Sequence, residues 1–451
     1  MKKYKKYKDS GLEWIGEIPE SWSIVHLKYI GEIKYGLGQP PKEKVGGLPI
    51  IRATNVFRGK ISTDKLLYVD PEDIPYNRDP ILKENDIIIV RSGAYTGDSA
   101  IIPKEFEGAV TGYDMTLRVN NANPKFVAFS LLSNYLLNQQ LILHSLRAAQ
   151  PHLNAEELGH SFLVNPPLQE QKSIAHYLDQ KTTIIDALLQ KTKQKIALLK
   201  EQRTAIINQA VTKGLAHLSP KEGGTKGVKM KDSGVEWIGE IPESWGLRQL
   251  KSMANITRLA GAEYTSYWET CETGEIKVLR GQNIGFNKII KKATIDRISN
   301  ELSMKLIRSR LFKGDIVFPC VGSVGNALVI EESDTWHINQ NIAKITPQNM
   351  SSPFLCYFLL SHFAKYQILL FNTSDMQPSV LVGSLRRFLV PYPPVSEQSV
   401  IAEYLDEKNI ELDTLLEKQK SRLHLLKEYR QSLISEVVTG KLCVHNEIPV
   451  T

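Results

Sequence analysis

The chain has 451 residues, of which 42% are hydrophobic and 23% charged, with a formal net charge of +7. This length predicts about two to four domains, and the composition argues against a disordered, collagen-like or low-complexity chain. The longest apolar run, Phe354 to Leu360, is far shorter than the roughly 20 residues of a membrane helix, and no apolar stretch follows the basic N-terminus. Neither a membrane span nor a signal peptide is therefore expected.

The cysteines and the charge give weaker indications. Cys271, Cys320, Cys356 and Cys443 form neither a disulfide framework nor the C-x-x-C spacing of a zinc site. We therefore expect a reducing cytoplasm and no bound metal. The positive charge is compatible with a polyanionic partner, although surplus lysine on solvated surfaces explains it equally well.

The chain is a tandem duplication, and the repeat begins near the N-terminus. Residues 9–22 read DSGLEWIGEIPESW, and residues 232–245 repeat them with Val235 in place of Leu12. Towards the other end of each copy, PPLQEQKSIAHYLD at 166–179 matches PPVSEQSVIAEYLD at 393–406. The matched positions are 223 residues apart at the front and 227 at the back. Each copy therefore has about 225 residues.

The middles of the two copies diverge in sequence but keep the same order of elements. Each contains an extended segment with a polar cluster, then a β-branched run with a glycine turn typical of a hairpin, then an apolar stretch typical of a helix. The pairs of segments are 50–57 and 278–286, 86–102 and 315–330, and 126–142 and 354–370. This order predicts a mixed α+β domain in each copy.

A seven-residue repeat follows Glu170 and Glu397 and predicts two long helices of about 40 residues that form a coiled coil. Arg203 and Arg430 interrupt the apolar seam at matching positions, as residues that fix the register would. The predicted seam consists of Leu178, Ile185, Leu189, Ile196, Leu199, Ile206, Leu405, Leu412, Leu416, Leu423, Leu426 and Leu433.

The connection between the copies indicates how the helices run. A parallel pair would require this Gly/Lys-rich segment to span about 60 Å, the limit of its fully extended length, whereas an antiparallel pair needs almost no span. The predicted fold is thus α+β: two pseudo-two-fold-related mixed α/β domains separated by an antiparallel two-helix coiled coil. The shared segment 9–30 should then pack near the end of the second helix. The predicted boundaries are 1–165 and 232–392 for the domains (the latter with its shared segment 232–253), 166–214 and 393–442 for the helices, 215–231 for the linker and 443–451 for a tail.

Two similar modules suit two DNA half-sites, and the polar groups of the middles are appropriate for reading bases. Arginine suits guanine, Asn or Gln suits adenine, and glycine turns can approach phosphates through backbone N–H groups. Ordinary turn and strand-edge roles remain the alternative for each residue. The candidate DNA-contacting residues are Arg52, Thr54, Asn55, Arg91, Ser92, Gly93, Thr96, Arg280, Gln282, Asn283, Ser323, Gly325, Asn326, Gln340 and Asn341.

The duplicated D-S-G-x-E-W-I-G-E-I-P-E-S-W, the duplicated P-P-x-x-E-Q-x-x-I-A-x-Y-L-D and the heptads before V-T-G-K-L resemble the specificity subunit of a type I restriction-modification system. The resemblance covers nearly the whole chain. It implies two target-recognition domains, each reading half of a bipartite double-stranded DNA site, with the coiled coil setting the spacer. It also implies that the repeated segments dock two methyltransferase subunits and, through them, restriction subunits. S-adenosylmethionine, ATP and Mg²⁺ would serve those partners, and this chain would bind no cofactor and catalyse nothing.

The conserved ends of each copy carry the predicted docking residues, with tryptophan anchors beside acidic residues. Burial of the tryptophans in the core is the alternative. The docking candidates are Trp14, Trp22, Trp237, Trp245, Glu170, Gln171, Glu397 and Gln398.

Two other classes of function are alternatives to this interpretation. A self-sufficient DNA-modifying enzyme would need cofactor motifs, and Asn165-Pro166-Pro167-Leu168 only resembles the N-P-P-aromatic motif of amino-methyltransferases. Its fourth position is not aromatic and the second copy lacks the asparagine, so a turn leading into a helix is favoured. A pure coiled-coil scaffold would not need the divergent, polar middles.

Overall fold

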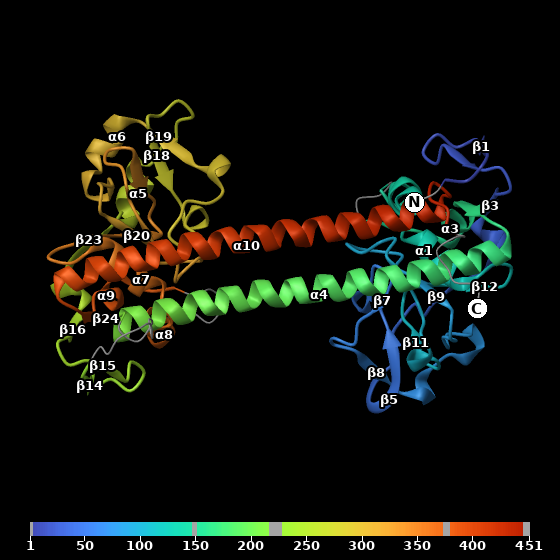
Figure 1. Ribbon diagram of the computed structural model, residues 1–451, viewed down its shortest axis with the longest axis horizontal. Helices are drawn as coiled ribbons and strands as arrows, with labels where there is room; N and C mark the ends of the chain where they lie inside the picture. The colour runs from blue at the N-terminus through green and yellow to red at the C-terminus, as the bar shows by residue number, and fades with distance from the viewer. Residues whose placement is uncertain (1–2, 147–150, 216–227, 373–378, 445–451) are drawn as a thin grey trace. The chain divides into compact units, whose positions relative to one another are not determined.

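The computed structural model describes residues 3–146, 151–215, 228–372 and 379–444. These form two compact units, one comprising Met1–Lys193 with Lys420–Thr451 and the other Gln194–Gln419. Each unit contains one α/β module and half of each of two long helices, α4 (Leu168–Lys213) and α10 (Val395–Val438), which Figure 1 shows as continuous. The predicted linker 215–231 and tail 443–451 lie largely outside the described residues.

The first module contains a four-stranded sheet and a three-stranded sheet. The first has the order β10-β9-β12-β4 and the second β11-β5-β8, in which β11 and β5 run parallel. The bounds are Gly31–Tyr35 for β4, Glu43–Ile51 for β5, Leu67–Val69 for β8, Ile87–Ile89 for β9, Ser99–Ile101 for β10, Val110–Thr111 for β11 and Met115–Val119 for β12. Shorter pairs join β1 (Tyr7–Asp9) to β2 (Glu17–Pro19), β3 (Ser23–His26) to β13 (Phe162–Asn165), and β6 (Val56–Phe57) to β7 (Lys60–Ile61).

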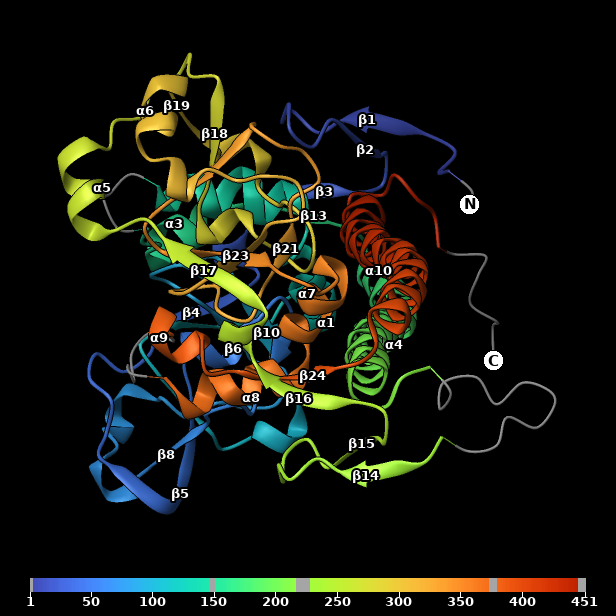
Figure 2. The ribbon, with the colours of Figure 1, turned by 90° about the vertical axis from the view of Figure 1, so that its left-hand side faces the viewer.

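The second module repeats this topology. Its sheets have the orders β17-β23-β20-β21 and β19-β18-β22, in which β18 and β22 run parallel. The bounds are Ala254–Arg258 for β17, Ile276–Leu279 for β18, Asp296–Ile298 for β19, Ile316–Pro319 for β20, Leu328–Val329 for β21, Trp336–Ile338 for β22 and Ile342–Pro347 for β23. Figure 2 faces this unit, and the ribbon of β14 (Met230–Asp232) and β15 (Glu240–Pro242) lies outside its larger sheets, as does the pair β16 (Gly246–Gln249) and β24 (Leu389–Tyr392). The predicted hairpins at 86–102 and 315–330 are confirmed as β9–β10 and β20–β21.

The apolar stretches 126–142 and 354–370 are each broken, rather than continuous helices. In the first copy α1 (Pro124–Leu131) gives way at Ser133 to a π-helical segment, η6 (Asn134–Ile142), and then to α2 (Leu143–Ser145). In the second copy α7 (Ser352–Leu360) is followed by α8 (His362–Leu370), and the Ser361 hydroxyl caps the N-terminus of α8. A serine that bonds to the backbone starts a new helical segment at the same place in both copies.

The described residues of the modules also form four further short α-helices. They are α3 (Ala155–His160) in the first and α5 (Gly261–Tyr267), α6 (Asn300–Lys305) and α9 (Val382–Leu385) in the second. No single helix among the described residues is long and apolar enough to cross a membrane, although the bent pair Pro124–Leu131 and Asn134–Ser145 passes a test of length and composition.

The long helices run antiparallel within each unit, as predicted. In the first unit Leu178 and Ile185, near the start of α4, share a core with Leu433 and Val437, near the end of α10. In the second unit the end of α4 packs against the start of α10, and Leu199 clusters with Leu412 and Leu416. Seven of the twelve predicted seam residues are buried and the other five are half-buried.

The two arginines in the seam make equivalent ion pairs across the helix pair. Arg203 of α4 pairs with Asp413 of α10, and Arg430 of α10 pairs with Asp186 of α4 at 2.9 Å. A lysine of the adjoining module joins each aspartate, Lys288 at 3.1 Å and Lys60 at 2.7 Å. In each unit one aspartate therefore forms ion pairs both with the seam arginine of the other helix and with a lysine of the module.

Each shared segment packs against the far end of a long helix. In the first unit the Tyr7 hydroxyl donates to the Gly440 carbonyl at 3.1 Å, which confirms the predicted contact of this segment with the end of the second helix. Gly440 has a φ of +73° and lies against Pro19 and Trp22, so a Cβ there would clash. Gly214 holds the equivalent position beside Trp245, with a φ of +72°. Glycine suits both helix ends because a left-handed residue ends a helix at low cost.

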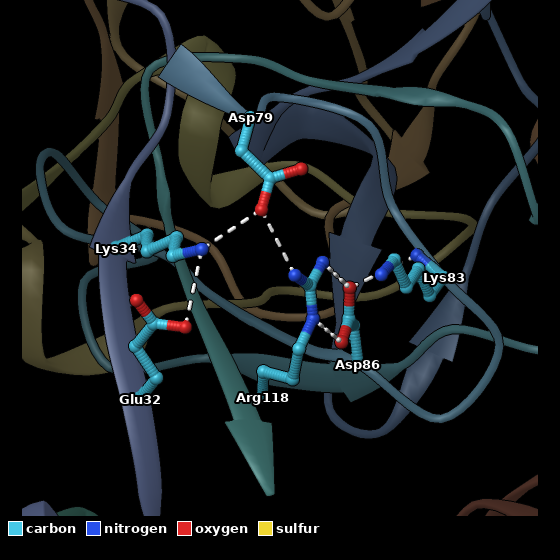
Figure 3. A network of polar contacts seen from close by, with 6 residues as sticks. All are labelled: Glu32, Lys34, Asp79, Lys83, Asp86 and Arg118. Atoms are coloured by element: carbon cyan, nitrogen blue, oxygen red, sulfur yellow. Dashed lines mark hydrogen bonds and ion pairs between the residues drawn. The ribbon is translucent and has the colours of Figure 1, made fainter. Parts of the chain in front are cut away.

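A charged network anchors the first module's sheet (Figure 3). Arg118 of β12 makes a bidentate contact with Asp86, with bonds of 3.0 and 2.9 Å, and reaches Asp79 at 2.9 Å. Lys34 of β4 joins Asp79 at 2.8 Å. In the second module Asp315 takes the place of Asp86 and accepts from Thr346. Because the aspartate also caps the preceding turn in both copies, it fixes where β9 and β20 begin.

Candidate nucleic-acid interface

Three turns meet at one end of each module, and we call this surface the three-turn face. It consists of residues 52–55, 91–97 and 112–114 in the first module and 280–283, 320–326 and 339–341 in the second. The carboxyl ends of parallel strands lie at the same sheet edge, so the turns after β5 and β11 come together, as do those after β18 and β22.

Hydrogen bonds fasten the three turns together. In the first module Gly112 N donates to Ile51 O at 2.8 Å, and Arg91 N donates to Asp114 Oδ1 at 3.3 Å. In the second module Asn339 N donates to Leu279 O at 3.2 Å, and Cys320 N donates to Asn341 O at 2.8 Å. All fifteen candidate DNA-contacting residues lie on this face of one module or the other. The structure thus gathers residues that are far apart in the sequence.

Two of the candidates support the face from inside, and their predicted role is corrected. Asn55 and Asn283 are fully buried. The Asn55 side chain accepts from Arg52 N and donates to the carbonyls of Ser62 and Asp64. Asn283 makes the matching bonds to Arg280 N and Lys291 O. The oxygen and nitrogen of both side-chain amides are hydrogen-bonded within the turn, so neither side chain presents a free group to a base.

Several turn residues have local partners of the same kind. Thr96 is buried and its hydroxyl donates to Gly93 O at 2.7 Å, while the Asn326 amide donates to Ile284 O at 3.0 Å. Gly93 and Gly325 have φ values of +87° and +93°, which explains why glycine occupies these turns. Thr96 is thus held within its turn, and a contact of this residue with DNA stays a prediction.

The remaining candidates keep accessible surface. Thr54 and Gln282 are exposed, while Ser92, Ser323, Gln340 and Asn341 are half-buried. Arg52 donates to the Lys65 carbonyl, and Arg280 pairs with Asp296, so both guanidiniums already have a partner. Arg52, Thr54 and Ser92 line a groove of about 230 Å³ together with Tyr113 and Asp114.

The sequence reasoning missed three residues of this face in the first module. Tyr35, at the end of β4, and Tyr113 both lie with their rings against the Arg91 guanidinium. Asp114 is buried beside them, and burial raises the pKa of its carboxyl to about 6. Aromatic residues near a basic turn were the available signal, but their distance from Arg91 in the sequence concealed the contact.

The docking candidates separate into buried and exposed residues. Trp22 and Trp245 are buried and donate from Nε1 to Glu170 at 2.9 Å and to Glu397 at 3.0 Å. Gln171 and Gln398, also buried, accept from the backbone N–H groups of Asn123 and Ser351. Trp22 and Trp245 thus join each shared segment to the start of its long helix, and Gln171 and Gln398 join the starts of α1 and α7 to the same place. The docking role predicted for these buried residues is therefore corrected.

Other surfaces remain open for a partner. Trp14 is 44% exposed. Trp237 is half-buried, and its ring centre lies 5.5 Å from that of Tyr366. On the helices, Leu198 and Leu425 occupy equivalent positions and are 63% and 62% exposed. Single exposed apolar residues are common on protein surfaces, but these two recur at the same position of both copies.

The paired α/β modules, their repeated three-turn faces and the antiparallel helices define a duplicated protein with two similar surfaces. The family model "type I restriction modification DNA specificity domain" matches residues 19–198 and again residues 242–424. The chain belongs to this family of type I restriction-modification specificity subunits, and the predicted fold class of two mixed α/β target-recognition domains with a long antiparallel helix pair is confirmed.

Individual relatives match over almost the whole chain. The MjaVIII specificity subunit of Methanocaldococcus jannaschii is 25% identical, over 95% of each chain. The EcoBI specificity subunit of Escherichia coli is 24% identical, over 94% of this chain and 87% of its own. A chain from a structure describing complex assembly and conformational transition of the type I R-M system matches with a TM-score of 0.62. It covers 94% of this chain and 99% of its own at 16% identity, which is evidence of a shared fold alone.

Proposed function

We propose that each module reads one half of a bipartite double-stranded DNA site on behalf of a methylating and restricting complex. The observation that carries this proposal is the three-turn face, which occurs once in each module on the same buried framework. Asn55 and Asn283 each hold it by bonds to the backbone of the preceding arginine and of the following loop, yet the exposed residues around them differ, as with Thr54 and Gln282. A common framework with different exposed groups suits two modules that recognise different sequences.

The proposed partners follow from the family and from the exposed surface of the helices. Two methyltransferase subunits would dock on Trp14 and on the outward apolar residues such as Leu198 and Leu425, and restriction subunits would join through them. S-adenosylmethionine, ATP and Mg²⁺ would be bound by those partners, so this chain would direct the chemistry without performing it. The complex would act in the cytoplasm, where the host DNA lies.

Domain exchange in the assembled complex tests this proposal. The chain is co-expressed with its partner methyltransferase in a host without other adenine methylation, and the methylated adenines are mapped by sequencing. We expect methylation at a split motif, lost when this chain is omitted. Replacing residues 31–165 with the middle of another specificity subunit should change one half of that motif only.

A matched exchange of the second module is the control, and it should change the other half. A change in both halves after either exchange would contradict separate reading by the two modules. Unchanged methylation after both exchanges would contradict DNA recognition by the modules altogether.

A further inference from the structure

The first module holds an arginine in contact with the rings of two exposed tyrosines. The Arg91 guanidinium carbon lies 4.5 Å from the ring centre of Tyr35 and 4.4 Å from that of Tyr113. The rings are 45% and 48% exposed. Stacking on an aromatic face is favourable for a guanidinium, and two faces restrict both its position and its plane.

Hydrogen bonds fix the same arginine further. Its backbone N–H donates to the buried Asp114 carboxylate, and its Nη2 lies 3.1 Å from His152 Nε2. Because arginine can only donate, this contact requires the His152 tautomer whose proton is on Nδ1. The side chain is thus oriented before any ligand arrives. Among the described residues Nη1 makes no hydrogen bond, and Nε is buried without a partner.

The strand pairing identifies the equivalent positions in the second module. Met115 pairs with Tyr35 and Ile89, and Ala343 pairs with Arg258 and Phe318, so Met115 and Ala343 correspond. Counting along each strand from this pair matches Tyr35 with Arg258, Arg91 with Cys320 and Tyr113 with Asn341. Cys320 is buried. All three members of the stack are therefore replaced in the second module.

The replacement of these three residues contrasts with the structural residues that the two modules share. The residues that hold the turns and strands keep their type in both modules, as Asp86 and Asp315 or Gln140 and Gln367 do. A stack that the fold needed would be expected in both copies. Its presence on the three-turn face of one module only indicates a role in what that module recognises.

We infer that Arg91 reads a guanine in the half-site of the first module, with Tyr35 and Tyr113 as positioning residues, and that the second module reads its half-site without this device. The inference rests on the proposed function. A planar guanidinium held in one orientation can bond to O6 and N7 of guanine at once in the major groove. A phosphate contact would position the DNA but carry no sequence information, so it gives no reason for this arrangement to occur in one module only.

The first experiment changes the arginine and maps methylation by the complete complex. Arg91→Lys keeps the charge but loses the planar pair of donors. We expect one guanine position of the first half-site to accept other bases, with discrimination reduced about 10- to 100-fold, while the second half-site is unchanged. The matched control, Arg78→Lys, changes an exposed arginine of the same module that lies outside the three-turn face, and it should leave the motif unaltered.

The second experiment needs no variant. Binding of the wild-type complex is measured on DNA in which each guanine of the first half-site is replaced in turn by 7-deazaguanine, which lacks the N7 acceptor. One position should weaken binding about tenfold or more, and that position should be the one that Arg91→Lys relaxes.

Three outcomes would overturn the inference: a first half-site without guanine, equal binding of all the substituted DNAs, or an Arg91→Lys complex that methylates the same motif less efficiently. The last result would assign Arg91 to a phosphate. These outcomes are distinct from failure of the proposed function, in which the wild-type complex would methylate no split motif.

Discussion

At the scale of single residues, Asp114 shows how a carboxylate can serve the recognition face at a cost to stability. Its side chain is 2% exposed, and desolvation raises its pKa from 3.8 to about 6, although bonds from the backbone N–H groups of Arg91 and Ala53 oppose that change. The buried charge orders two of the three turns. At neutral pH the folded protein must therefore carry a charge that burial disfavours.

The sign of the resulting pH dependence follows from the raised pKa. Between pH 3.8 and about 6 the folded state keeps the Asp114 proton while the unfolded state has lost it, so the contribution of this group to stability falls as pH rises. Above pH 6 the cost is constant, and a pKa raised from 3.8 to about 6 corresponds to on the order of 3 kcal/mol. Asp114→Asn has no charge to bury.

We therefore expect the stability of Asp114→Asn relative to the wild type to improve by up to this amount between pH 4 and pH 7. Urea unfolding of the full chain across this range measures it. The control is Asp179→Asn, which removes an exposed carboxylate paired with Lys125. A stability difference between Asp114→Asn and the wild type that does not vary with pH would show that Asp114 titrates normally.

At the scale of elements, the long helices separate residues that hold the fold from residues that remain available. Leu199 is buried in the seam against Leu412 and Leu416, whereas its neighbour Leu198 points to solvent, as Leu425 does on α10. The proposed methyltransferase surface therefore lies one residue away from the coiled-coil core.

The adjacent residues Leu198 and Leu199 allow the proposed docking role and the packing role to be tested separately. Leu198→Glu combined with Leu425→Glu should leave thermal unfolding nearly unchanged but reduce methyltransferase retained in affinity purification at least about tenfold, because charges replace exposed apolar contacts. Leu199→Ala should instead destabilise the chain by about 2–4 kcal/mol through a cavity in the seam. Full retention by the double variant would exclude this surface as the docking site.

The elements were the most predictable part of the molecule. Periodicity and an internal repeat suffice for the long helices, and the order of apolar and glycine-punctuated segments suffices for an α+β module. The breaks at Ser133 and Ser361 were not foreseen. In a sequence, a serine that starts a new helical segment looks the same as a serine inside a helix, until the hydrogen-bond partner of the hydroxyl is known.

The site was predictable only in part, for a physical reason. Polar residues after strands indicated where the turns are, and parallel strand ends bring them together. Which polar groups face outward depends on tertiary contacts, so Asn55 and the exposed Thr54 could not be separated by type. The tryptophan and Glu-Gln repeats were conserved between the copies because they fasten the fold from inside, a role that repetition alone does not distinguish from docking.

At the scale of the whole molecule, each compact unit combines one module with half of both long helices. Any change in helix length therefore acts on the connection between the units rather than on either recognition face. This organisation makes the proposed role of the coiled coil in setting the DNA spacer open to a direct test.

Removing residues 190–196 from α4 and residues 417–423 from α10 deletes one heptad from each helix at equivalent places and keeps the apolar seam in phase. Each helix shortens by about 10 Å, which is the length of about three base pairs. We expect both half-sites in the methylation motif to persist while the preferred spacer shortens by about three base pairs.

The matched control removes only residues 190–192 and 417–419, which breaks the heptad phase of the seam and should lower the midpoint of thermal unfolding below that of the heptad deletion. A heptad deletion that is more stable than this control would show that the phase of the seam, and not helix length alone, holds the helices of each unit together. A soluble heptad deletion that methylates the original motif with its original spacer would contradict the ruler role, and the spacer would then have to be set by the docked partners.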